Sequence, residues 1–111
     1  MASLNHCATV ILSRGEPWQP GFATEPYEAG WAREAVIFLN ALDQSTAGGE
    51  VAVQISPDGI LWVNEGTRLV LPHKPGELTF AKLTHFGQFL RLVAQGEDYP
   101  ARRIMATMCL K

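Results

Sequence analysis

A turn between two apolar runs decides the fold: Val51-Ala52-Val53-Gln54-Ile55-Ser56-Pro57-Asp58-Gly59-Ile60-Leu61-Trp62-Val63. The residues before the turn alternate in polarity and an apolar run follows it, so the segment predicts a β-hairpin. In the turn, Pro57 presets φ, Asp58 accepts backbone hydrogen bonds, and Gly59 takes the position that needs a positive φ. The hairpin sets the strand register and therefore which faces are buried.

The composition predicts a single domain that associates with other subunits. The chain has 111 residues, 47% of them hydrophobic and only 18% charged. An ordinary soluble domain has about 25% charged residues, so part of the apolar surface is expected to face a partner. The net charge of −2 and the lack of a basic run predict no nucleic-acid partner.

The sequence predicts neither export nor a membrane span. Residues 1–7 lack the basic start and long apolar core of a signal peptide, and the longest apolar run, 35–39, is far too short to span a bilayer. Cys7 and Cys109 lie near opposite ends of the chain, in segments expected to be strands that could pair. Without an export signal, two reduced, buried thiols are the expected state, and a disulfide formed outside the cell is the alternative.

Segment 13–31 is predicted to be an extended arm. Three prolines interrupt it, so it cannot hold one regular element for long. It is nevertheless rich in aromatic residues, unlike a disordered linker. We expect these aromatic side chains to dock on the chain's own sandwich or, by preference, on a neighbouring subunit: Trp18, Phe22, Tyr27 and Trp31.

The rest of the chain predicts an all-β domain. Segment 32–42 fits either a helix or a strand with apolar residues on both faces, and the strand is favoured. Segment 78–94 fits one helix or two strands, and Gly87 in its middle favours the strands. With a strand at 7–12, about eight short antiparallel strands result, which is typical of a single β-sandwich or jelly roll. The expected domain is 1–111, with the sandwich at 32–111.

No site chemistry emerges from the polar residues. The three histidines, His6, His73 and His85, lack the paired spacing of a zinc site. The sequence contains no nucleophile elbow and no phosphate-binding glycine loop, and its acidic residues lie mostly in predicted turns. We therefore expect no catalytic residue, no metal and no cofactor, and the chain is not expected to be an enzyme.

Trp62 has two interpretations. It either packs between the sheets or stays exposed beside the turn as a platform on which a sugar could stack, and burial is favoured because large aromatic side chains mostly contribute buried area. Arg91 is expected to pair with Glu34 or Asp58 across strands.

Two stretches carry a resemblance to known families. Residues 53–59 with Trp62, followed by 86–92, resemble a pattern of discoidin-like jelly rolls and of small β-sandwich proteins of tailed-phage virions, such as head decoration and fibre-associated proteins. The virion resemblance implies a structural capsid decoration or cement protein, made in the host cytoplasm without a signal peptide. It also implies a homo-oligomer, with a trimer favoured, that binds a major capsid or other virion protein. The discoidin-like resemblance implies instead a non-catalytic module that binds carbohydrate.

Overall fold

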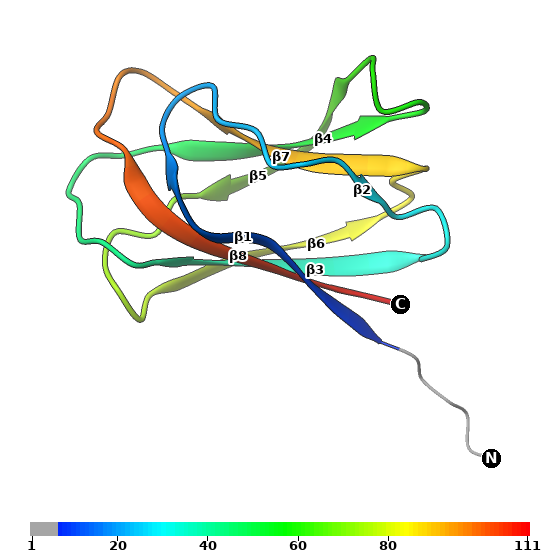
Figure 1. Cartoon of the computed structure of the whole chain (residues 1–111), viewed down its shortest axis with the longest axis horizontal. Helices are drawn as coiled ribbons and strands as arrows, with labels where there is room; N and C mark the ends of the chain where they lie inside the picture. Colours follow the sequence, from blue (N-terminus) through cyan, green and yellow to red (C-terminus); the bar gives the residue numbers. More distant parts are fainter. Residues whose placement is uncertain (1–6) are drawn as a thin grey trace.

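The computed structural model describes residues 7–111 and shows two stacked antiparallel sheets with no helix in that range (Figure 1). One sheet, called sheet A, has the order β1-β8-β3-β6, and sheet B has the order β2-β7-β4-β5. The strands are β1 (Ala8–Trp18), β2 (Tyr27–Glu28), β3 (Glu34–Ala41), β4 (Glu50–Ser56), β5 (Val63–Val70), β6 (Leu78–Thr84), β7 (Phe89–Gln95) and β8 (Arg102–Leu110). Successive strands lie in different sheets except β4 and β5, which form a hairpin, and this arrangement of eight strands is a jelly roll. The predicted fold class is confirmed.

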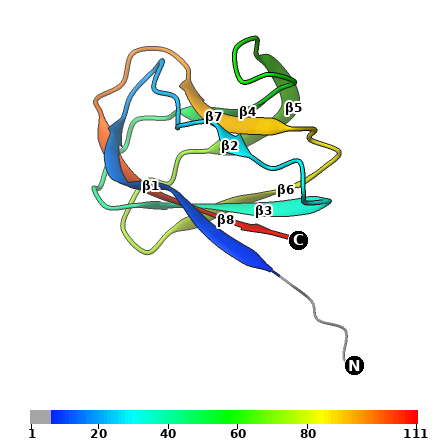
Figure 2. The same cartoon turned by 45° about the vertical axis from the view of Figure 1, so that its right-hand side comes forward.

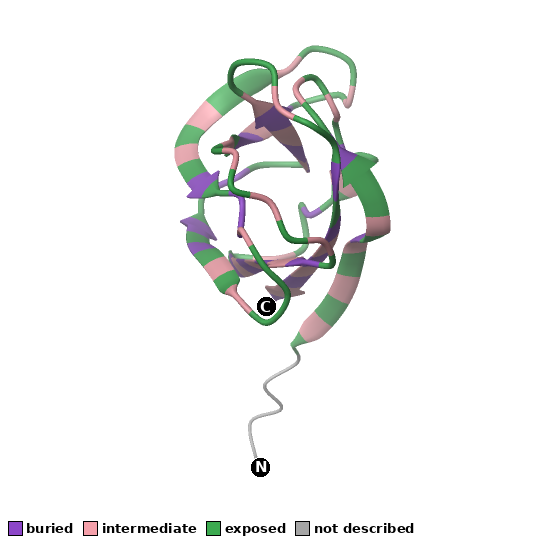
Figure 3. Cartoon of the chain, turned by 90° about the vertical axis from the view of Figure 1, so that its left-hand side faces the viewer, coloured by how far each residue is buried: buried purple, intermediate pink, exposed green. Residues whose placement is uncertain are grey.

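Alternation along the strands builds the core between the sheets. In β8, Ile104, Ala106, Met108 and Leu110 are all buried, as their spacing predicts. The 32–42 segment is a strand, β3, and it lies in the middle of sheet A. The two sheets stack as layers (Figure 2), and buried positions alternate with half-buried or exposed ones along their strands (Figure 3).

β1 is longer than the sequence indicates and continues to Trp18 instead of ending near Leu12. It stays paired to β8 across two register shifts. One lies between Ile11 and Ser13, and the other lies between Arg14 and Glu16, at Gly15, which has φ +93°. Pro17 is tolerated because β1 is an edge strand, where a missing N–H breaks no ladder on the open side.

Buried Arg102 ties sheet A to two loops. Its Nη1 donates to the carbonyl oxygen of Pro72 at 3.0 Å, and its Nη2 donates to the carbonyl oxygens of Ala47 and Gly48. The guanidinium also lies 5.6 Å from the centre of the Tyr99 ring. Burial raises the pKa of Tyr99, while the neighbouring Arg102 opposes that change. This arginine binds carbonyl dipoles, so it fixes loop positions at one end of the sandwich.

Candidate assembly surface

Three of the four aromatic residues of segment 13–31 dock on the chain itself. Trp18 is completely buried, and its Nε1 donates to Ser13 Oγ at 3.0 Å, while Ser13 Oγ donates to the carbonyl of Ile104 at 2.8 Å. The Phe22 ring stacks on Trp18 with centroids 5.1 Å apart. The preference for a neighbouring subunit is therefore wrong for Trp18, because its ring fills this chain's own core.

The rest of that segment runs along the edge of sheet B. The N–H of Gly21 donates to the carbonyl of Ala94, and the N–H of Thr24 donates to that of Leu92, both at 2.9 Å. Phe22 and Tyr27 are half-buried against the core. Trp31 alone of the four aromatic residues is mostly exposed, at 53%, so it keeps a side chain available for contact with another protein.

The hairpin exists, but its second strand begins later than predicted. β5 starts at Val63, and residues 57–62 form a loop. The backbone N–H groups of Ile60 and Leu61 donate to Asp58 Oδ1 at 2.8 and 3.0 Å. Both bonds lower the pKa of Asp58, and the bond from Leu61 has the larger effect. Ser56 Oγ accepts from the N–H of Gly59 at 2.8 Å. The bonded loop holds Ile60 and Leu61 out in solvent, 77% and 70% exposed.

Trp62 does not lie between the sheets. It is half-buried, and the guanidinium carbon of Arg91 lies 4.3 Å from its ring centre. Arg91 Nε donates to Gln54 Oε1 at 2.9 Å, so neither Glu34 nor Asp58 is its partner. The sequence misplaces Trp62 because it sits in the loop, where strand alternation does not apply. Arg91 covers one face of the Trp62 ring, so a smaller part of the ring surface is open for stacking against a sugar.

The outer face of sheet A is largely apolar, and the sequence analysis did not identify it. Phe80 and Leu78 of β6 are 59% and 61% exposed. The Phe38 ring lies 6.3 Å from that of Phe80, between centroids. Half-buried or exposed apolar side chains from the other strands continue this surface: Val36, Met105 and Ile11. The signal in the sequence was that apolar residues occupy both faces of 35–42.

The outer face of sheet B carries polar side chains that form hydrogen bonds to one another, beside the exposed apolar Val70. Gln54 Nε2 donates to Asn64 Oδ1 at 3.0 Å. Arg68 Nη1 pairs with Glu50 Oε2 at 3.0 Å and donates to Gln95 Oε1 at 3.2 Å. These polar groups therefore have hydrogen-bond partners within the sheet.

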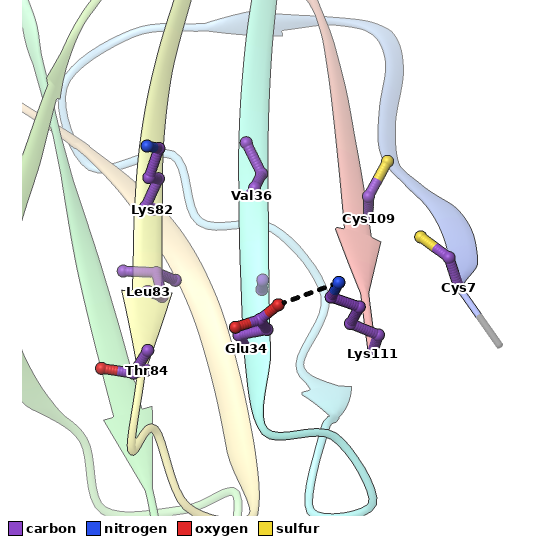
Figure 4. A pocket seen from close by; sticks show the side chains of 9 residues that line it. Cys7, Glu34, Val36, Lys82, Leu83, Thr84, Cys109 and Lys111 are labelled. Atoms are coloured by element: carbon purple, nitrogen blue, oxygen red, sulfur yellow. Dashed lines mark ion pairs between the residues drawn. The ribbon is translucent and has the colours of Figure 1, made fainter. Parts of the chain in front are cut away.

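A shallow hollow lies at one end of the outer face of sheet A, where Lys111 Nζ lies 3.4 Å from Glu34 Oε1 (Figure 4). Cys7 and Cys109 line it, and both are free; Cys7 is exposed and Cys109 is half-buried. β1 and β8 pair as expected, but the expected burial of both thiols is wrong, because they point to the outer face.

No metal centre is formed by residues 7–111, which hold no cluster of three His, Cys, Asp or Glu side chains suited to a metal ion. His73 Nδ1 lies 3.6 Å from Glu77 Oε1 on the surface, and His6 lies outside the described residues. In the same range, no helix is long and apolar enough to cross a membrane.

Comparisons with known proteins match the fold alone. No model of a protein family matches the sequence, and no curated protein does. The structure is similar to the crystal structure of the SPBc2 prophage-derived protein YomS, with a TM-score of 0.66 and 8% identity over 100% of this chain and 98% of that one. A weaker likeness, with a TM-score of 0.48 and 12% identity over 99% of this chain and 93% of that one, is to a chain from Bacillus endospore appendages, a family of disulfide-linked pili.

Proposed function

We propose that this chain is a structural subunit of a phage-type virion, and more specifically a decoration or cement protein that associates with itself and binds the capsid surface. The observation that carries the proposal is the apolar outer face of sheet A, where Phe80 and Leu78 are 59% and 61% exposed. Exposed apolar patches on small proteins mark surfaces that bind other proteins. The prophage origin of the structurally similar protein supports the phage context.

The proposed role involves no reaction. It requires a rigid scaffold and exposed contact surfaces, and the jelly roll supplies both. A second exposed apolar site, the loop that carries Ile60 and Leu61, lies beyond the end of sheet B. Because its backbone is held by Asp58 and Ser56, the loop would lose little conformational entropy on binding. We propose that this loop and Trp31 supply capsid contacts beyond those of sheet A.

Mass spectrometry of purified particles tests the proposal. Particles from the phage or induced prophage that encodes the chain should contain it in many copies, in a constant ratio to the major capsid protein. A chain absent from washed particles would contradict the virion role. Specific binding of an isolated monomer to a glycan array would instead support the carbohydrate-binding alternative.

A further inference from the structure

Strand register arranges the outer face of sheet A as rows that cross all four strands. The central row joins Phe80 to Phe38, Phe38 to Thr107 and Thr107 to Ile11. One step toward the hollow, the next row is Lys82, Val36, Cys109 and Thr9, and one step further Glu34 stands beside Lys111. The strand pair β3 and β8 forms the midline of this face.

We propose that the partner of this face is a second copy of the chain, packed face to face about a two-fold axis that runs parallel to the strands, between β3 and β8. This inference rests on the proposed function, because it names the partner that covers the assembly surface. Stacked sheets pack about 10 Å apart with their strands nearly aligned, so their outer faces can interdigitate in this way.

The charges on the face complement themselves under this axis. Glu34 and Lys111 lie on opposite sides of the midline, on β3 and just after β8, with Lys111 Nζ 3.4 Å from Glu34 Oε1. The rotation places Glu34 of each copy opposite Lys111 of the other. The end of the interface that holds the hollow then gains an alternating set of two carboxylates and two ammonium groups, which favours this partner over one of unrelated charge pattern.

The central row complements itself in the same way, and in the row on its other side Leu78 of one copy meets Arg14 of the other. Because the axis exchanges β6 with β1, Phe80 of one copy meets Ile11 of the other, and Phe38 meets Thr107. Lys82 meets Thr9 and faces no second cation. Every residue of the central row therefore meets an apolar group or a threonine, as the isologous contact of a two-fold dimer requires.

The size of the face is sufficient for a dimer. Four strands about 4.8 Å apart and about eight residues long, at ~3.3 Å per residue, span about 500 Å² in projection. Side-chain relief brings the covered area toward the ~800 Å² per partner of a standard interface. One flat face is covered by one other sheet, so this contact produces a dimer and not the trimer expected from the sequence.

The first test introduces a charge at the centre of the face. Sedimentation velocity on the full chain should show a dimer, and Phe80→Lys should raise the dimer dissociation constant at least about 30-fold, the loss expected for a central aromatic anchor. The matched control is Val70→Lys, an exposed apolar residue on the outer face of sheet B, 55% exposed against 59% for Phe80. This control should remain dimeric. Circular dichroism should show that both variants keep the β fold.

The second test asks whether the charge pair acts between copies. Alone, Glu34→Lys gathers four cations at the end of the interface that holds the hollow, and Lys111→Glu gathers four carboxylates there, so each variant should dimerise about 10-fold more weakly. Mixed in equal amounts, the two variants should form a heterodimer as tight as the wild-type dimer. A contact that acted only within one chain would not be restored by mixing.

The outcomes separate this inference from the proposed function. A wild-type monomer, a trimer, or an oligomer that Phe80→Lys leaves intact would overturn the two-fold packing, even if the chain is abundant in particles. A dimer that behaves as described but is absent from washed particles would leave the packing standing and reject the virion role.

Discussion

The two outer faces of the sandwich differ in chemistry although the same jelly roll builds both. On sheet B, Gln54 donates to Asn64 and accepts from Arg91, so polar side chains on three neighbouring strands satisfy one another. On sheet A, the corresponding middle of the face is occupied by Phe38 and Phe80, whose rings lie 6.3 Å apart.

This difference explains the low charge content of the chain. The 18% of charged residues are not spread evenly: sheet A carries Glu34, Lys82 and Lys111 at one end of its outer face and Arg103 at the other, while the centre is apolar. On sheet B, polar side chains of neighbouring strands form hydrogen bonds to one another across the outer face. A sequence short of charge therefore predicts a covered face, and the outer face of sheet A has the apolar centre that this prediction requires.

The largest expected effect on stability comes from the core between the sheets. A core substitution gives the loss of unfolding free energy against which substitutions on the outer faces are compared. Trp18→Ala removes a fully buried ring and its hydrogen bond to Ser13, and should lower the free energy of unfolding by about 3–5 kcal/mol in urea titration. Trp31→Ala, at a residue 53% exposed, should change it by less than about 0.5 kcal/mol. Similar losses for both would mean that Trp18 does not belong to the core.

Arg102 and Arg103 are adjacent on β8, one buried and one exposed, so substitutions at these positions compare the stability contributions of the two sides of sheet A. Arg102→Met removes a buried guanidinium and leaves the carbonyls of Pro72 and Ala47 without their donor, which should cost about 2 kcal/mol of unfolding free energy. Arg103→Met breaks an exposed pair in which Arg103 Nη2 lies 2.8 Å from Asp43 Oδ1, and should cost less than about 1 kcal/mol. Thermal and urea unfolding of both variants at pH 7 measure the difference. An equal cost would show that the buried arginine does not fix its loops.

The strands could be predicted from the sequence because local alternation encodes them. Ile104, Ala106, Met108 and Leu110 point inward as their spacing predicts, and the turn of Asp58 and Gly59 joins β4 to β5. Register and turn chemistry are properties of short segments, so one sequence is sufficient to find them.

The apolar face of sheet A, which we propose as the assembly surface, could not be predicted, because it depends on pairing between distant strands. Phe38 and Phe80 become neighbours only when β3 pairs with β6, and Ile11 joins their row only through β8. Trp18 was missed for a related reason: Pro17 indicates a broken segment until β1 is known to be an edge strand. Trp62 lies in a loop, where no periodicity fixes the direction of its side chain.

A double-mutant cycle tests whether the outer face of sheet B is held together laterally. Arg91→Ala removes the guanidinium from the Trp62 ring, 4.3 Å away, and the hydrogen bond to Gln54. Combined with Trp62→Leu, the cycle should give a coupling of about 0.5–1 kcal/mol in urea unfolding, as for a partly exposed cation–π pair. Arg91→Ala alone should leave the oligomeric state unchanged. Additive losses would show that the stacking contributes nothing to the stability of this face.

The smallest expected effect is a pH dependence of the stability that two carboxylates contribute, Asp58 next to sheet B and Asp43 next to sheet A. Backbone N–H groups of Leu61 and Ile60 lower the pKa of Asp58, and the Arg103 side chain lowers that of Asp43. A lowered folded-state pKa contributes stability that is complete above the ordinary value of 3.8 and is lost as the pH falls through the folded-state value. The stability advantage of wild type over Asp58→Asn and over Asp43→Asn should therefore be constant from pH 7 to pH 5 and decline progressively as the pH falls below 3.8.

Salt distinguishes the two causes of that dependence. The Asp43 effect depends on an exposed ion pair, which ~1 M salt screens because the Debye length falls to about 3 Å, so the advantage over Asp43→Asn should shrink in urea unfolding at high salt. The Asp58 effect depends on short hydrogen bonds from the loop backbone, at 2.8 and 3.0 Å, and should persist. An Asp58 advantage that salt abolishes, or that does not change with pH, would mean that the carboxylate does not hold the loop in which Ile60 and Leu61 are exposed.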